Sequence, residues 1–332
     1  MRVLITGGAG FIGSHLARAC LARGDTVSVI DDLSTGVQSA VPPGARWIQG
    51  DVRDPEVVRP AVEAADLVVH LAAAVGPALV ARDPAGTWSR NVDGTSCVLD
   101  AATSVGSRVI IASTSEVYGD LARDPHRAGR GLAEDEPVRV RADGRRDVYA
   151  ISKLAAEAYA FAVHRTHLLP VTVVRPFNVV GPAQSSRYGM VLARFAEAAA
   201  LGRPLPVYGD GRQRRCFLHV HDAVRALLAL AECVRAEGVV VNLGSDEEVA
   251  ISDLAVRVCR VADIPLSVRH VPFEQVYGEG FVDPALRRPD LSRLHDLIAF
   301  VPERSLDDAI KDAVGVARSR LGVAAQRPRT QR

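Results

Sequence analysis

The sequence predicts an α/β fold in which a doubly wound parallel sheet carries a smaller, mostly helical lobe. Three features predict this fold. Short apolar runs alternate with helix-length segments, a glycine-rich turn joins the first run to the first helix, and the pattern after residue 175 becomes rich in Pro and Gly. The runs do not alternate apolar with polar residues, which is typical of strands buried on both faces of a parallel sheet.

The strands and helices are expected in a definite order. Residues 3–5 form a first strand, 7–13 a turn, 14–23 a helix and 26–30 a second strand, which together make a βαβ unit. Helices of the smaller lobe are expected at 190–201 and 251–261. Further strands of the sheet are expected at 47–49, 67–71, 109–112, 171–174 and 239–242.

The run at 239–242 is expected to return to the sheet, so each domain is assembled from separated segments. We assign residues 1–174 and about 217–244 to the sheet domain, and about 175–216 and 245–323 to the smaller lobe. The 332 residues suffice for one large or two intimate domains. Residues 122–147, dense in Arg, Gly and acids, and the tail 324–332 are expected to be flexible.

The composition disfavours several classes of protein. Apolar residues make up 48% of the chain and 40 basic side chains nearly balance 39 acidic ones, as in ordinary globular proteins, so disorder and nucleic-acid binding are disfavoured. No apolar run is long enough to span a bilayer and no secretory signal is evident, so we expect a cytoplasmic protein without a membrane partner. Five cysteines without CxxC spacing argue against a disulfide framework and a metal site.

The turn at residues 7–13 has the spacing of a dinucleotide-binding motif. Gly7, Gly10 and Gly13 recur at intervals of three between a strand and a helix. The first permits a tight turn, the second lets the backbone approach a pyrophosphate, and the third lets the helix pack against the strand. Free N–H groups at the helix N-terminus favour phosphate. A plain glycine-rich turn is the alternative, which the strand–turn–helix context disfavours.

Acidic residues after the second and third strands indicate which dinucleotide binds. Asp31 ends the second strand, 18 residues after Gly13, where a carboxylate accepts hydrogen bonds from ribose hydroxyls and repels a 2′-phosphate. NAD is therefore favoured over NADP, with Asp32 as the competing candidate. Asp51 and Val52 stand where a contact with the adenine edge is expected.

A tyrosine and a lysine form the candidate catalytic pair. Tyr149 and Lys153 are four residues apart in a helical segment, which places them on one helical face. A free tyrosine has a pKa near 10, so a phenol that moves protons near neutrality needs a neighbouring positive charge, which Lys153 or an oxidised nicotinamide supplies. A surface pair is the alternative. Residues 113–119, from Ser113 to Gly119, follow a predicted strand and make the combination specific.

Together these motifs resemble the extended short-chain dehydrogenase/reductase family, the nucleotide-sugar epimerases and dehydratases, from Val3 to about Ile310. The resemblance implies a Rossmann domain, NAD as cofactor, a UDP- or dTDP-linked sugar as substrate, and a homodimer. Residues 207–215 and 288–290 resemble nucleotide-sugar-binding signatures. The other matching stretches are 6–13, 71–73 with 91–95, 113–119 with the tyrosine–lysine pair, and 175–182.

The resemblance also implies individual roles. Tyr149 is the base that takes the sugar hydroxyl proton, Lys153 lowers its pKa and binds the ribose, and Thr114 hydrogen-bonds the same sugar oxygen. Asn178 and Arg215 are expected to hold the diphosphate or base, and Arg288 the diphosphate, with a surface ion pair as the alternative for each arginine. Residues expected at the cofactor are Gly7, Gly10, Phe11, Ile12, Gly13, Asp31, Asp32, Asp51, Val52, Leu71, Ala72, Ala73, Asn91, Ser113, Tyr149, Lys153 and Pro176. Those expected at the substrate are Thr114, Ser115, Tyr149, Asn178, Val191, Tyr208, Arg215 and Arg288.

Oxidation at sugar C4 is common to the family, and the groups around C4 to C6 decide the reaction. We expect a 4-epimerase acting through a transient 4-keto sugar, because residues 277–281 and 287–290 look like a bacterial branch of sugar-nucleotide 4-epimerases. The alternative is a UDP-glucuronate decarboxylase that uses the same pair with Glu116 as a further catalytic residue. A 4,6-dehydratase is disfavoured because Ser115 stands where that class typically has Asp. A non-catalytic NAD-binding regulator would be expected to lack Tyr149 or Lys153.

Overall fold

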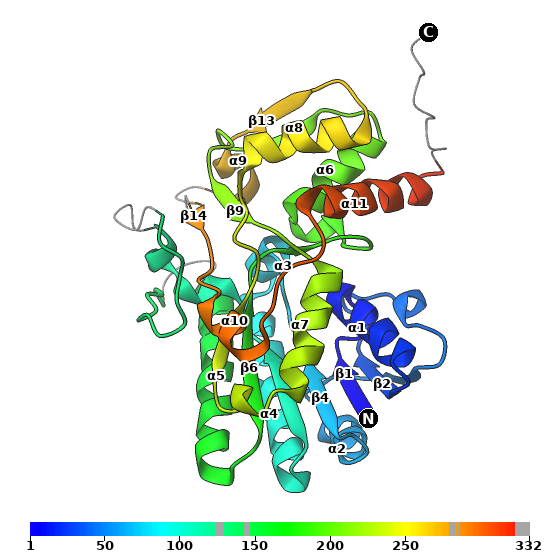
Figure 1. Cartoon of the computed structure of the whole chain (residues 1–332), viewed down its shortest axis with the longest axis vertical. Helices are drawn as coiled ribbons and strands as arrows, with labels where there is room; N and C mark the ends of the chain where they lie inside the picture. The colour runs from blue at the N-terminus through cyan, green and yellow to red at the C-terminus, as the bar shows by residue number, and fades with distance from the viewer. Residues whose placement is uncertain (124–128, 143–146, 279–282, 284–285, 323–332) are drawn as a thin grey trace.

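The computed structural model describes residues 1–123, 129–142, 147–278, 283 and 286–322. Figure 1 shows two lobes: a sheet with its helices in the lower part, and a smaller lobe built around α6, α8 and α11 above it. The N-terminus lies at the lower end of the sheet. Within the described ranges, no helix has both the length and the apolar character needed to cross a membrane.

The larger lobe is organised around a seven-stranded sheet with the strand order β11-β6-β5-β4-β1-β2-β3, in which all pairings are parallel. All four residues of β4 are buried, because helices cover both faces of the sheet. This confirms the predicted doubly wound fold. The strands are β1 (Arg2–Thr6), β2 (Thr26–Asp31), β3 (Arg46–Gln49), β4 (Leu67–His70), β5 (Arg108–Ala112), β6 (Val171–Pro176) and β11 (Val240–Leu243).

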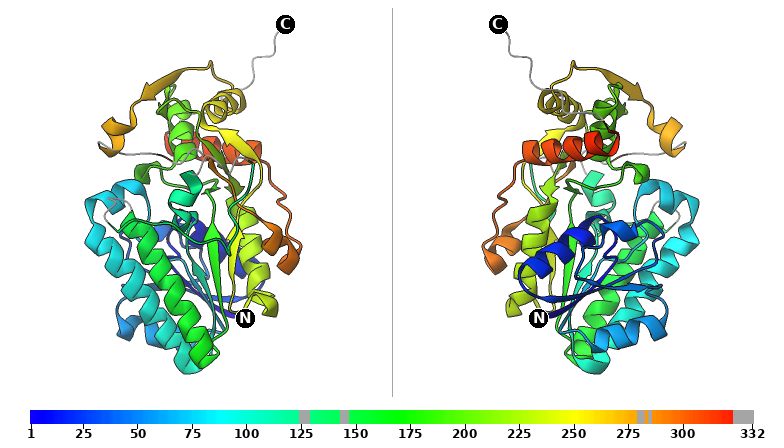
Figure 2. Two further views of the ribbon diagram at one scale, coloured as in Figure 1. Left: turned by 90° about the vertical axis from the view of Figure 1, so that its left-hand side faces the viewer. Right: turned by 90° about the vertical axis from the view of Figure 1, so that its right-hand side faces the viewer.

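Two groups of helices cover the sheet (Figure 2). On one face, α1 (Phe11–Ala22), α7 (Val220–Glu232) and α10 (Ser292–Ile298) share an apolar cluster with the strands. On the other, the cluster includes α2 (Pro55–Glu63), α4 (Pro84–Val105), which follows the short α3 (Pro77–Arg82), and α5 (Asp147–His167). The position of α10 differs from the predicted boundary, which assigned all of 245–323 to the smaller lobe. Its buried Leu294 packs in the cluster of the larger lobe.

The smaller lobe buries α6 (Val191–Ala200), α8 (Ile251–Ala262) and α11 (Leu306–Arg320) in one apolar cluster. It also contains α9 (Phe273–Tyr277) and short strands that the sequence did not predict. β8 (Leu205–Tyr208) pairs with β13 (Val268–Val271), β9 (Arg214–Cys216) lies between β12 (Glu248–Ala250) and β14 (Leu286–Arg287), and β7 (Val179–Val180) pairs with β10 (Leu218–His219). Strands this short show no alternation that the sequence could reveal.

Part of the segment expected to be flexible is anchored instead. Residues 124–128 and 143–146, and the tail 324–332, lie outside the described residues. In the described part, the N–H of Leu132 donates to the carbonyl of Arg288 at 2.9 Å, and the N–H of Asp290 donates to the carbonyl of Leu132 at 2.9 Å. The buried carboxylate of Glu134 accepts the N–H of Asn242 at 2.7 Å. The expectation of flexibility was wrong here, because a buried polar side chain pairs with backbone groups instead of water.

Candidate active site

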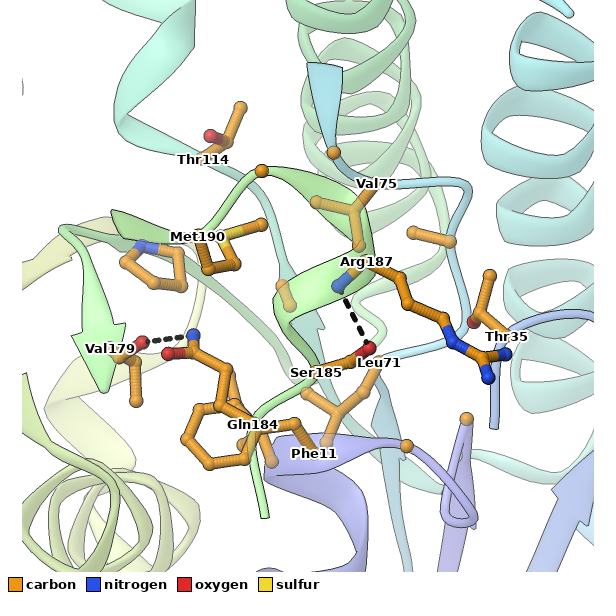
Figure 3. Close-up of a pocket in the computed structure, with 18 of the residues that line it drawn as sticks. Phe11, Thr35, Leu71, Val75, Thr114, Val179, Gln184, Ser185, Arg187 and Met190 are labelled. Atoms are coloured by element: carbon orange, nitrogen blue, oxygen red, sulfur yellow. Dashed lines mark hydrogen bonds between the residues drawn. The ribbon is translucent and has the colours of Figure 1, made fainter. Parts of the chain in front are cut away.

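A cavity of about 860 Å³ lies between the two lobes, at the carboxyl ends of the parallel strands. This is the edge at which open α/β sheets bind ligands. Figure 3 shows part of the cavity, where Phe11 and Leu71 of the larger lobe line the same space as Gln184 and Met190 from the chain that follows β7. Of the residues predicted for the site, all line this cavity except Asn91 and Arg288.

The glycine-rich turn has the geometry that a dinucleotide requires. Gly7 has a φ of +71°, and a Cβ at this position would lie 2.7 Å from the backbone nitrogen of Ala72. A Cβ on Gly13 would lie 2.3 Å from the carbonyl oxygen of Gly7. α1 begins directly after Gly10, three residues earlier than predicted, and Gly10 offers no side chain to cap the first N–H groups. These groups are left for the pyrophosphate of NAD, so the turn fits the cofactor.

Asp31 lies buried at the end of β2 and faces the cavity. Its carboxylate accepts the N–H of Ala9 at 3.0 Å and that of Leu33 at 2.9 Å, which fixes its orientation. Desolvation raises its pKa, opposed by these two hydrogen bonds. The competing candidate Asp32 lines the same cavity but is exposed, so the buried and oriented carboxylate of Asp31 fits the ribose position better.

Asn91, predicted to contact the cofactor, does not line the cavity. Its side chain accepts the N–H of Ala74 at 2.8 Å and donates to the hydroxyl of Ser152 at 3.0 Å. It therefore fastens the loop after β4, which does line the cavity, to the helix that carries Tyr149. The prediction is corrected to a positioning role, because the amide is fully buried behind the loop.

Tyr149 and Lys153 both lie in α5 and both line the cavity, where they are 7% and 2% exposed. Desolvation and the nearby carboxylate of Glu116 raise the pKa of Tyr149, whereas a hydrogen bond with Thr114 and the charge of Arg287 lower it. The ammonium of Lys153 donates to the carbonyl of Ala112 at 2.8 Å. Its influence on the phenol remains a prediction for the cofactor-bound enzyme.

A buried carboxylate lies behind Lys153. Glu157, one helical turn further along α5, accepts two hydrogen bonds from Arg175, at 3.0 and 2.7 Å, and a short one from Ser113. Desolvation lowers the pKa of Lys153 to about 8, and the charge of Glu157 partly opposes this shift. Lys153 and Glu157 of α5 are thus held in place by hydrogen bonds to Ala112 of β5 and from Arg175 of β6.

Thr114 starts the 3₁₀ turn η2 (Ser115–Tyr118), and its hydroxyl accepts the N–H of Glu116 at 3.1 Å. Thr114 also hydrogen-bonds Tyr149, and Glu116 lies near enough to that phenol to raise its pKa. The carboxylate of Glu116 lies 3.6 Å from the guanidinium of Arg287. The carboxylate of Glu116, the guanidinium of Arg287 and the phenol of Tyr149 therefore lie close together in the cavity.

The sequence selected Arg288 for the site, but the structure places Arg287 there. Arg287 lies opposite Arg215 in the pairing of β14 with β9, and both line the cavity. Arg288 follows the last residue of this strand, lies outside the cavity lining and binds Glu248 at 3.1 Å. Arg215 is paired with Asp283 at 2.6 Å. The sequence could not reveal which of the two arginines lines the cavity, because this depends on how the two-residue strand β14 pairs with β9.

The remaining predicted site residues also line the cavity. Asn178 has a φ of +35°, and its amide donates to the carbonyl of Cys216 at 2.8 Å, which ties β6 to β9. Ser115, Pro176, Val191 and Tyr208 also line the cavity. Sequence analysis did not select Arg194, a residue of α6 whose guanidinium lies over the Tyr208 ring and which lines the cavity too. No group of three or more metal-ligating side chains is found in the part of the chain that the structure describes.

A dinucleotide turn and a buried tyrosine–lysine pair at one cavity define a NAD-dependent enzyme of the short-chain dehydrogenase/reductase type. The chain belongs to the NAD dependent epimerase/dehydratase family, whose family model matches residues 3–244. This confirms the resemblance seen in the sequence, and NAD is the cofactor.

Two relatives bear on the reaction. The chain is 36% identical over 318 residues to a UDP-N-acetyl-alpha-D-glucosaminuronate decarboxylase of Bacillus cytotoxicus, which covers 94% of this chain and 96% of that protein. It is 35% identical over 326 residues to UDP-glucuronic acid decarboxylase 2 of Arabidopsis thaliana, covering 97% of this chain and 69% of that one. These relatives favour the decarboxylase alternative over the 4-epimerase that we expected from the sequence.

A solved structure supports the fold of the whole chain. The UDP-glucose 4-epimerase of Thermotoga maritima, determined with UDP-glucose, superimposes with a TM-score of 0.87 at 27% identity, covering 97% of this chain and 100% of that chain. Similarity of fold does not separate the two reactions, because both are carried on the same scaffold.

Proposed function

We propose that the protein is a NAD-dependent decarboxylase of a UDP-hexuronate of the UDP-glucuronate type. The observation that carries the proposal is the Glu116–Arg287 pair, a carboxylate and a guanidinium 3.6 Å apart that line the cavity together with Tyr149. The decarboxylase names of the two sequence relatives support it.

Oxidation at C4 prepares a hexuronate to lose carbon dioxide. Bound by the glycine-rich turn and Asp31, NAD would supply the reversible hydride acceptor for C4. A C4 ketone is β to the C6 carboxylate, so the electrons of the C5–C6 bond can move toward the C4 oxygen as carbon dioxide leaves. The resulting enolate takes a proton at C5. The net change replaces the carboxylate by hydrogen.

The residues of this chain divide the remaining tasks. Tyr149, hydrogen-bonded to Thr114, takes the proton of the C4 hydroxyl and gives it back. Arg287 supplies a positive charge that binds the C6 carboxylate and orients it. Glu116, the partner of Arg287, is the acid–base group available to protonate C5. The buried positions of Tyr149 and Lys153 keep water away from the reacting atoms.

Epimerisation at C4 is the second candidate, favoured by the similarity to the UDP-glucose 4-epimerase structure. It requires the same tyrosine, lysine and cofactor. A carboxylate–guanidinium pair beside the sugar has no task in that reaction, because nothing leaves C5. For this reason we place decarboxylation first.

Product analysis of a panel of nucleotide sugars tests the proposal. The purified protein with NAD is incubated with UDP-glucuronate, UDP-N-acetylglucosaminuronate and UDP-glucose, and products are separated and weighed by mass spectrometry. Loss of carbon dioxide from one of the two uronates is the expected result. An unchanged mass with altered retention shows epimerisation and overturns the proposal, as does loss of water.

A further inference from the structure

We propose that Arg194 binds the diphosphate of the nucleotide-sugar substrate, the role that the sequence assigned to Arg288. The inference rests on the proposed function only in taking a nucleoside-diphosphate sugar as substrate, and it holds for either reaction. It concerns the wall of the cavity formed by α6 and β8.

Arg194 has a fixed position and unused donors. Its Cζ lies 3.7 Å from the centre of the Tyr208 ring, so the guanidinium stacks on the phenol. Its Nε and Nη1 are buried and hydrogen-bond to nothing within the described residues. A buried donor without an acceptor is energetically costly, and more so when it is charged. A ligand that brings anionic oxygen to this point relieves that cost.

The other arginines of the cavity are already paired or exposed. Arg90 binds Asp83 at 3.2 Å, Arg215 binds Asp283 at 2.6 Å, and Arg287 lies 3.6 Å from Glu116. Arg187 and Arg320 also line the cavity, but both are exposed, so water satisfies their N–H groups. Arg194 therefore lines the cavity with a positive charge and two N–H groups that have no acceptor among the described residues.

The position of Arg194 suits a phosphate more than a base. A diphosphate supplies a negative counter-charge for the guanidinium of Arg194. Arginine also binds phosphate oxygens with several N–H groups at once. Uracil and thymine are neutral and offer weaker acceptors. Arg288 cannot serve instead, because its side chain lies outside the cavity lining and is bound to Glu248 at 3.1 Å.

Calorimetric titration of the NAD-loaded, full-length protein with UDP and with uridine tests the assignment without turnover. Arg194→Gln should weaken UDP binding by about tenfold or more, the effect of losing hydrogen bonds to a charged group, and leave uridine binding within about twofold. Arg288→Gln, the matched control, should change UDP binding by less than about threefold. Arg194→Lys keeps the charge and should recover part of the lost affinity.

Two results would overturn the assignment. In the first, Arg194→Gln binds UDP as tightly as wild type does. In the second, the variant loses affinity for uridine and UDP equally, which would mean that Arg194 contacts the base or only stabilises the fold. NAD binding and thermal unfolding of each variant show whether it is folded. If Arg194→Gln does not fold, the same titrations of Arg194→Lys decide, since a UDP affinity equal to that of wild type would contradict stacked, multidentate binding. Failure of the wild type to bind UDP at all would instead refute the nucleotide-sugar premise of the proposed function.

Discussion

At the residue scale, burial shifts the pKa values of Tyr149 and Lys153, the candidate catalytic pair. Lys153 is 2% exposed, and desolvation lowers its pKa to about 8, partly opposed by Glu157. In the unfolded chain the same ammonium has its ordinary pKa of 10.5. Between these two values the unfolded state binds more protons than the folded state, so the free energy of unfolding contributed by Lys153 rises with pH across this window.

Replacing Lys153 by Met should therefore stabilise the cofactor-free protein while abolishing activity. The lowered pKa corresponds to roughly 3 kcal/mol at pH 7, and the lost hydrogen bond to Ala112 costs about 1 kcal/mol, which leaves a gain of about 2 kcal/mol. Urea unfolding at pH 7 to 10 measures this gain in stability, and the rise with pH expected for the wild type should be absent in the variant. A variant less stable than wild type at pH 7 would contradict a destabilising buried charge.

The Arg287 assignment predicts an asymmetry between neighbouring arginines. Arg287→Gln should lower kcat/KM for UDP-glucuronate by about 10- to 100-fold, because a charge-assisted contact to the substrate carboxylate is lost. Arg288→Gln serves as the control and should stay within about threefold. Steady-state kinetics compare the two, and equal losses would show that the strand register does not select between them.

These two arginines mark what the sequence could predict at this scale and what it could not. The glycines of the turn, Asp31, and the tyrosine–lysine pair carry their chemistry in residue type and spacing, and they line one cavity. Which of Arg287 and Arg288 faces that cavity depends on pairing with β9, a contact between distant segments. Nothing local in the sequence records it.

At the element scale, the described part of segment 122–147 positions the strand that carries Arg287. The amide of Asn242 in β11 donates to the carbonyl of Leu132 at 2.8 Å and to that of Asp290 at 3.1 Å. Gly131 lies so close to this strand that a Cβ would meet the carbonyl oxygen of Pro289 and the nitrogen of Asp290, each at 2.7 Å. The loop, β11 and the chain after β14 are thus joined by the buried side chain of Asn242 and by the close approach of Gly131.

Gly131→Ala should displace the chain at 289–290 and with it Arg287. We expect kcat/KM for the uronate to fall by about tenfold, since misplacement by about 1 Å can cost up to 10²-fold. Gly315→Ala is the control, because its Cβ would meet no atom within 4 Å in α11, and it should raise stability by about 0.5 to 1 kcal/mol with unchanged activity. Wild-type kinetics in a folded Gly131→Ala protein would exclude a positioning role for the loop.

Element lengths explain the other differences between sequence and structure. The sheet strands are buried runs bounded by turns, and their positions agree with the prediction to within one or two residues. The strands of the smaller lobe have two to four residues, so their pairing is decided by tertiary contacts. The anchored loop was misread because charge-rich composition is typical of solvated segments, whereas Glu134 is buried by its partners.

At the scale of the whole molecule, the reaction is set by where the two lobes meet. The larger lobe supplies the cofactor turn, the tyrosine–lysine pair and Glu116, whereas the β14–β9 pair supplies Arg287 and Arg215. The sheet domain could be predicted because its pattern is local and repeated. The choice between epimerase and decarboxylase could not, because the contact on which the proposed decarboxylation rests, between Glu116 and Arg287, joins residues 171 positions apart.

The most direct test of the proposed decarboxylation is to run the reaction of UDP-glucuronate with the protein and NAD in D₂O and to analyse the product by mass spectrometry and NMR. Decarboxylation predicts a UDP-pentose that carries one solvent-derived deuterium at C5, together with released carbon dioxide. Glu116→Gln should slow this incorporation strongly. A product that keeps all its carbon and gains no deuterium, with inversion at C4, would contradict decarboxylation and establish epimerisation instead.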